Sequence, residues 1–194
     1  MLLSHKKKFL FIHIQKTGGT SITRWLQNSV SDMEMSIEAH SPLSVVEDRY
    51  RDYFKVAFVR NPFDRLVSWY SMISKVKNPN PLQQKVLTHS KNFTEFILNC
   101  EHLTSKSNWK PFHYNQIDYL TDAKGTVAVD FIGKFEDFSQ GIKTISDYLD
   151  IDSHTIGHIN SSTHTAYQDY YTEKTRDIIS NRFQRDLHYF NYTF

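Results

Sequence analysis

A short apolar run that leads into two adjacent glycines does most to constrain the fold of this chain. The run spans Phe9 to Ile14, is interrupted only by His13, and is followed by Gly18 and Gly19. Its length and content are typical of a strand buried in a parallel sheet. Beyond the glycines, apolar residues recur at helical spacing, namely Ile22, Trp25, Leu26 and Val30. The sequence therefore predicts a strand, a glycine loop and a helix that starts near Thr20.

A second segment repeats this order. Lys55 to Arg60 contains a short apolar run and leads into Asn61 and Pro62. Asn61 suits an N-cap, and Pro62 suits the first helical position because its missing amide hydrogen has no helical partner there. We expect the following helix to reach about Lys77. Its buried stripe is formed by Phe63, Leu66, Val67, Tyr70 and Ile73.

The rest of the chain continues the alternation of strands and helices. Val127 to Phe135 is typical of a third buried strand. Two further helices are expected, with apolar faces formed by Phe138, Ile142, Ile145 and Leu149 and by Ile178, Ile179, Phe183 and Leu187. The stretch from Leu82 to Tyr119 is polar and aromatic, and we expect it to face the substrate. This pattern predicts an α/β fold with a central parallel sheet flanked by helices.

Length, charge and cysteine content indicate which classes of function and which cellular compartment suit this chain. A chain of 194 residues suits a single domain, and its net charge of +2 argues against non-specific nucleic-acid binding. Cys100 is the single cysteine, so an internal disulfide is excluded and a cytoplasmic protein is expected. The apolar stretch near the start is far shorter than the roughly 20 residues of a membrane span, so no membrane anchor is expected. The sequence leaves the oligomeric state open.

The glycine loop, Gln15 to Ser21, combines features that suit a bound anion. Gly18 and Gly19 let the backbone approach a ligand closely, and a helix start presents amide hydrogens and a partial positive charge. Lys16 adds a charge, and hydroxyl donors come from Thr17, Thr20 and Ser21. A tight turn with a solvated lysine would use similar residues, but the full combination favours phosphate. It is not a Walker A loop, because the lysine precedes both glycines.

Arg60 and Ser68 are candidates for a second phosphate contact. Arg60 ends the second predicted strand, at the edge where parallel sheets place their ligands, and its guanidinium can bind phosphate in two places. Ser68 follows about two helical turns later. A surface salt bridge for Arg60 and helix packing for Ser68 are the plainer alternatives.

Two motifs resemble segments of a known family, the carbohydrate-type sulfotransferases related to the heparan and chondroitin O-sulfotransferases. Residues 11–22, FIHIQKTGGTSI, resemble the segment that binds the 5′-phosphosulfate of PAPS, 3′-phosphoadenosine 5′-phosphosulfate. Residues 59–70, VRNPFDRLVSWY, resemble the segment that binds its 3′-phosphate. Weaker similarity continues at 130–136 and 186–192. The family usually has proline where this chain has Gln15.

The resemblance implies a fold, a reaction and a set of site residues. The expected fold is a three-layer, P-loop-like single domain over residues 1–194. The expected reaction moves a sulfuryl group from PAPS to a hydroxyl, of a carbohydrate or a small molecule, and releases PAP. Lys16 would stabilise the leaving phosphate. The 5′-phosphosulfate would be held by Lys16, Thr17, Gly18, Gly19, Thr20 and Ser21, and the 3′-phosphate by Arg60 and Ser68.

His40 is the candidate for the base that takes the acceptor proton. A neutral imidazole suits this role near pH 7 because its ordinary pKa is about 6.5. Related sulfotransferases resemble this chain in having a histidine at this place that is assigned as the base. With ten histidines in the chain, a surface or core role is the plain alternative for any one of them.

No metal is expected, and two other functions stay open. His154 and His158 have the spacing of a chelating pair, but no acidic or cysteine neighbours complete a site. A P-loop-like phosphotransferase would share the strand, loop and helix but would need magnesium and ATP. A non-enzymatic module could bind RNA or other phosphates through Lys6 to Lys8, Lys16 and Arg60, with a steep dependence on salt.

Overall fold

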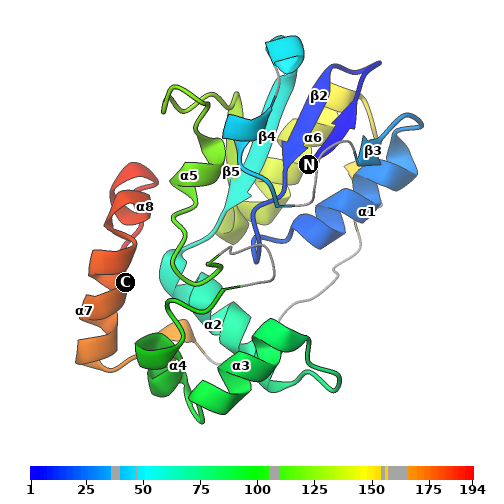
Figure 1. Cartoon of the computed structure of the whole chain (residues 1–194). Coiled ribbons are helices and arrows are strands. Elements are labelled where there is room, and N and C mark those ends of the chain that lie inside the picture. The colour runs from blue at the N-terminus through cyan, green and yellow to red at the C-terminus, as the bar shows by residue number, and fades with distance from the viewer. Residues whose placement is uncertain (36–39, 47, 105–109, 154–155, 157–165) are drawn as a thin grey trace. The chain divides into compact units, whose positions relative to one another are not determined.

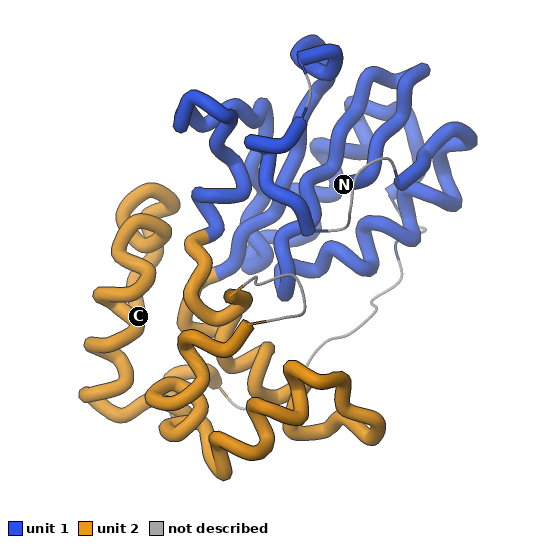
Figure 2. The backbone as a smooth tube through the Cα atoms, in the orientation of Figure 1, with its two compact units in different colours: residues 1–60, 116–161 blue, residues 61–115, 162–194 orange. Residues whose placement is uncertain are grey.

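The structure is a computed structural model that describes residues 1–35, 40–46, 48–104, 110–153, 156 and 166–194. The chain divides into two compact units (Figure 2). The first unit comprises residues 1–60 and 116–161, and the second comprises residues 61–115 and 162–194. That residues 1–194 act as a single domain stays a prediction.

The first unit is built on a five-stranded sheet (Figure 1). The strands are β1 (Leu2–Ser4), β2 (Phe9–Ile12), β3 (Glu34–Met35), β4 (Phe54–Val59) and β5 (Phe131–Lys134), in the order β3-β1-β2-β4-β5. Strands β2, β4 and β5 run parallel, whereas β1 pairs antiparallel with both β2 and β3. The predicted α/β class is confirmed. The sheet is mixed, however, and not parallel throughout as expected.

The antiparallel edge follows from the short connection between β1 and β2. Only residues 5–8 join these strands, and so short a link returns the chain antiparallel to itself. Lys8 has a positive φ of 47°, and its amide donates to the carbonyl of His5 at 3.3 Å. The lysine run of the sequence is therefore the turn of a hairpin.

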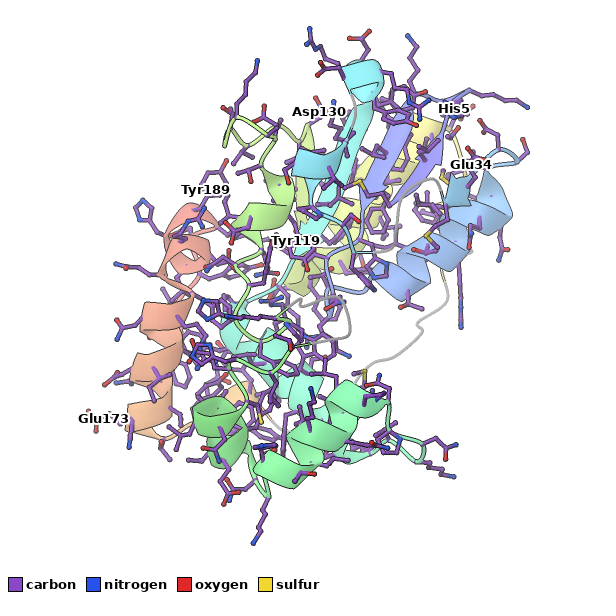
Figure 3. The ribbon with its side chains drawn as sticks, viewed as in Figure 1. His5, Glu34, Tyr119, Asp130, Glu173 and Tyr189 are labelled. Carbon is purple, nitrogen blue, oxygen red and sulfur yellow. The ribbon has the colours of Figure 1, made fainter. Side chains whose placement is uncertain are left out.

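Strand β5 is shorter than the predicted strand. Val127 forms only an isolated bridge with Thr121, and regular pairing with β4 begins at Phe131. Asp130, labelled in Figure 3, is hydrogen-bonded to the start of β4 just before this pairing begins. Its carboxylate accepts from the Lys55 amide at 2.7 Å, and its own amide donates to the Lys55 carbonyl at 2.9 Å.

Both faces of the sheet are buried within the first unit. Helices α1 (Gly19–Ser29) and α6 (Phe138–Leu149) pack on one face, and Figure 1 shows α6 behind the strands. The shared cluster includes Phe9, Phe11, Val56, Phe58, Ile22, Trp25, Leu26, Ile142, Ile145 and Leu149. Alternate strand residues turn to the other face and are also fully buried, namely Leu10, Ile12, Ala57 and Val59. The first unit also contains the short elements α5 (Ile117–Leu120), η1 (Leu43–Val45) and η2 (Asp48–Tyr50).

The second unit is helical. Its elements are α2 (Pro62–Ser74), α3 (Pro81–His89), α4 (Phe93–Asn99), η5 (Tyr167–Tyr170), α7 (Glu173–Arg182) and α8 (Gln184–Tyr189). They enclose a cluster that includes Phe63, Leu66, Trp69, Phe96, Phe112, Ile179 and Phe183. As predicted, Asn61 caps α2 by accepting from the Phe63 amide at 3.1 Å. Helix α2 ends at Ser74, before the expected Lys77, and the predicted last helix is broken at Phe183 into α7 and α8.

None of the helices in the described residues is both long enough and apolar enough to cross a membrane.

Candidate functional site

The glycine loop connects β2 to α1 and leaves the start of the helix open. Gly18 is the N-cap residue, with a φ of 83°, and no side chain caps α1. The Gly18 carbonyl accepts from the amides of Ser21 at 3.0 Å and Ile22 at 3.3 Å. A helix start that no side chain closes is the arrangement in which amide hydrogens and the helix dipole attract an anion.

The two glycines are required by close neighbours as well as by the backbone. A Cβ at Gly18 would lie 2.8 Å from Cε2 of Phe138, and one at Gly19 would overlap the ring of His13. The rings of Phe138 and His13 therefore pack closely against the backbone at Gly18 and Gly19, respectively. Side chains at either glycine would have to displace a ring.

Replacing Gly18 is expected to destabilise the protein more than replacing Gly125. Both glycines have a φ near 80°, but a Cβ at Gly125 meets no atom within 4 Å. Gly125→Ala should thus show only the cost of the left-handed backbone, about 1–2 kcal/mol, whereas Gly18→Ala adds overpacking of about 1–3 kcal/mol. Urea unfolding of both variants measures the difference. Equal losses of unfolding free energy would contradict the packing described for Gly18.

Two cations lie at the loop. Burial, followed by repulsion from Arg60, lowers the pKa of Lys16 from 10.5 to about 8. Nη1 of Arg60 donates to the Lys16 carbonyl at 3.2 Å, and its guanidinium carbon lies 4.2 Å from the ring centroid of Phe135. Arg60 is only 4% exposed. The structure thus holds two positive groups beside the open start of α1, which favours a bound anion.

Arg60 is fixed in place by Gln116. The Arg60 amide donates to Oε1 of Gln116 at 2.9 Å, and Nε2 of Gln116 donates back to the Arg60 carbonyl at 2.8 Å. Gln116 is fully buried and sits just before α5. This carboxamide satisfies both backbone groups of Arg60 where the β4 ladder ends.

The predicted loop hydroxyls differ in their surroundings. The Thr17 hydroxyl donates to the Ile14 carbonyl at 2.8 Å, and the side chain is fully buried, so its proton serves the loop itself. Ser21 is buried and Thr20 is exposed, both in the first turn of α1. Ser68 is buried on α2 in the second unit. The structure therefore brings Arg60 to the glycine loop, whereas a shared role of Arg60 and Ser68 stays a prediction.

His40 lies against His13. Nδ1 of His40 is 2.9 Å from the His13 carbonyl oxygen, and the two ring centroids are 4.4 Å apart in an edge-on arrangement. Because a carbonyl only accepts, Nδ1 of His40 carries the hydrogen, and Nε2 is the basic nitrogen of the neutral ring. Burial lowers the pKa of His40 below 6.5, although the bond to His13 opposes this shift. His40 is thus neutral near pH 7.

His13 joins the predicted base to the loop. Its ring is the one that a Cβ at Gly19 would strike, and it contacts the ring of His40. Burial, followed by repulsion from His40, lowers the pKa of His13 from 6.5 to about 3. His13 therefore carries no charge at neutral pH and does not compete with Lys16 for an anion.

The sequence as a whole matches the model of the sulfotransferase family over residues 1–193. The chain belongs to the sulfotransferase family. No curated protein matches it. Among solved structures, it is similar to a sulfotransferase from Alicyclobacillus acidocaldarius, with 16% identity over 93% of this chain and 92% of that one, and a TM-score of 0.46.

Sequence reasoning missed several residues of this candidate site. His13 interrupts the apolar run and directly precedes the loop motif, so its position was the available signal. Gln116, Phe135 and Phe138 give no comparable signal, because they reach the site from distant parts of the chain. His154 and His158 lie outside the described residues.

Proposed function

We propose that this sulfotransferase moves a sulfuryl group from PAPS to a hydroxyl of a carbohydrate acceptor and releases PAP. The observation that carries the proposal is the loop at the uncapped start of α1, where Lys16 and Arg60 place positive charge beside helix amides. A phosphate or sulfate group is the ligand that this combination suits best.

The loop residues fit the phosphosulfate end of such a donor. Gly18 and Gly19 leave backbone without side chains at the helix start, where a Cβ would crowd the loop. Gln15 adds a buried Oε1 that has no hydrogen-bond partner among the described residues. Rotating its amide would present hydrogen-bond donors from the same position to an anion. We assign the phosphosulfate to the loop residues Lys16, Thr17, Gly18, Gly19, Thr20 and Ser21.

Each proposed catalytic group has a distinct role. When bound, the donor supplies a sulfuryl group that passes to the acceptor oxygen while the bridging oxygen leaves with the phosphate. Lys16 stabilises the negative charge that grows on that oxygen. Nε2 of His40 accepts the proton from the acceptor hydroxyl, and the His13 carbonyl keeps the ring in the required tautomer.

The 3′-phosphate is assigned to Arg60 and Ser68. Arg60 offers a buried guanidinium that is oriented by its contacts with Lys16 and Phe135. Ser68 offers a hydroxyl on α2. Selectivity for a nucleotide with a 3′-phosphate is the property that separates this assignment from a general phosphate site.

Calorimetry with PAP and ATP tests the donor class. We expect wild-type protein to bind PAP more tightly than ATP in the presence of EDTA, and Lys16→Ala to lose PAP affinity. Lys143→Ala is the matched control, because Lys143 is an exposed lysine that pairs with Asp147 on α6. Equal affinity for both nucleotides, or unchanged PAP binding by Lys16→Ala, would overturn the assignment. Magnesium-dependent ATP turnover would select a phosphotransferase instead.

The acceptor is tested by assaying sulfuryl transfer from radiolabelled PAPS to oligosaccharides and to simple phenols. We expect label on the oligosaccharides. Transfer to phenols alone would contradict a carbohydrate acceptor while leaving the donor assignment intact.

A further inference from the structure

Three potential metal ligands meet in the second unit, and none of them belongs to the site proposed above. Glu101 and His102 follow the end of α4, and His113 lies in the turn that starts at Lys110. One donor atom from each residue lies within 4.8 Å of the other two. Two imidazole nitrogens and one carboxylate oxygen form a donor set that suits Zn²⁺ and similar divalent ions better than Mg²⁺ or Ca²⁺.

The Glu101 carboxylate is held in place by a buried cation. Nη2 of Arg182 donates to Oε2 of Glu101 at 2.8 Å, and the Arg182 side chain is only 4% exposed. The same guanidinium also donates to the carbonyls of Ile97 at 3.2 Å and Phe112 at 3.5 Å. Arg182 thus binds Oε2 of Glu101, and the other oxygen, Oε1, faces His113. Hydrogen bonds of this kind are what support a metal-binding carboxylate.

The histidines are near enough to coordinate after small movements. Nδ1 of His113 lies 2.8 Å from Oε1 of Glu101, and the rings of His102 and His113 have centroids 5.7 Å apart. Ligand atoms on a tetrahedral ion with bonds of about 2.0–2.1 Å lie about 3.3 Å apart. The His113 side chain is 49% exposed, and His102 is also exposed, so rotation of the rings can supply the difference. Open solvent leaves a coordination position for water.

We propose that Glu101, His102 and His113 bind one Zn²⁺ or a similar divalent ion. The ion replaces the hydrogen bond between His113 and Glu101, and the His113 proton moves to Nε2. The ion links the residues that follow α4 to the turn that contains His113. Because the ion binds the folded arrangement of these ligands, its binding free energy adds to the stability of the folded protein.

Zinc titration of metal-free protein tests the proposal. Full-length chain is stripped with EDTA and titrated with ZnCl₂ in competition with a chromophoric chelator. We expect wild type to bind one equivalent of zinc. His102→Ala and His113→Ala should each bind zinc at least about tenfold more weakly. His89→Ala is the control, because His89 is exposed on α3 and bonds within its own helix to the Lys85 carbonyl. It should bind zinc as wild type does.

Two further measurements distinguish ligand loss from misfolding and from another site. His113→Gln can keep a donor to Glu101, so a folded variant by circular dichroism that fails to bind zinc supports the site. Cobalt substitution should give d–d absorption bands that disappear in His102→Ala. Absence of binding to wild type, unchanged binding in both histidine variants, or loss in His158→Ala alone would overturn the proposal. None of these outcomes depends on the sulfotransferase assignment.

Discussion

Turnover by a His40→Ala variant is expected to fall by about 10²–10⁴-fold, the usual contribution of a general base, while PAP affinity stays unchanged. The basic Nε2 is lost in this variant, whereas the loop, Lys16 and Arg60 remain. Initial rates with PAPS, measured beside calorimetry with PAP, separate the two effects. His89→Ala serves as the control for removing a histidine elsewhere in the chain.

The pH profile gives a second readout for His40. In the proposed mechanism the neutral ring of His40 is the active form, so the rate should fall as pH drops through the His40 pKa. Burial places that pKa below 6.5, so the decline should begin on the acid side of the ordinary histidine value. Turnover retained by His40→Ala, or an acid limb that persists unchanged in that variant, would remove His40 from the mechanism.

Turnover by Lys16→Ala is expected to fall by about 10²–10³-fold or more, comparable to the loss of one donor from a site that stabilises developing charge. The same substitution removes the proposed ground-state contact to phosphate, so PAP affinity should fall as well. Lys16→Arg keeps the charge and should retain part of the binding. Turnover by Lys16→Arg tests whether an ammonium group, and not only a positive charge, is needed to stabilise the negative charge on the leaving oxygen.

The pKa of Lys16 adds a dependence on alkaline pH. Its value of about 8 in the unliganded protein means that the ammonium loses its proton as pH rises through 8. PAP affinity of wild type should therefore weaken above about pH 8. Lys16→Arg should not weaken there, because arginine stays protonated. An identical alkaline decline in wild type and Lys16→Arg would show that another group controls binding.

Much of the central fold could be read from local patterns. The apolar run before Gly18, the Asn61 cap and the helical stripes of α1 and α2 each follow from neighbouring residues, and the structure shows all of them. The antiparallel β1 was missed because three residues carry too little pattern to distinguish a strand. The end of α2 was expected near Lys77 and lies at Ser74, and the break at Phe183 was not predicted, because helix ends leave a weaker sequence signal than helix faces.

The candidate site was predictable where it is continuous in the sequence. Residues from Lys16 to Ser21 are consecutive and form the end of the loop after β2 and the first turn of α1. The two glycines indicate that the backbone there lies close to other atoms. The structure identifies their neighbours as Phe138 and His13. The clamp of Gln116 on Arg60 could not be predicted, because it joins residues separated by 56 positions.

Local sequence is enough to place the glycine loop at Gln15 to Ser21, since the strand, the glycines and the helix start are consecutive and their geometry is local. The electrostatics of that loop, in contrast, arise from contacts that form only when the chain folds. Burial and the approach of Arg60 bring the Lys16 pKa to about 8, and contact with His40 helps to keep His13 neutral. Such shifts depend on which distant groups remove water and bring charge close, and folding alone sets those distances.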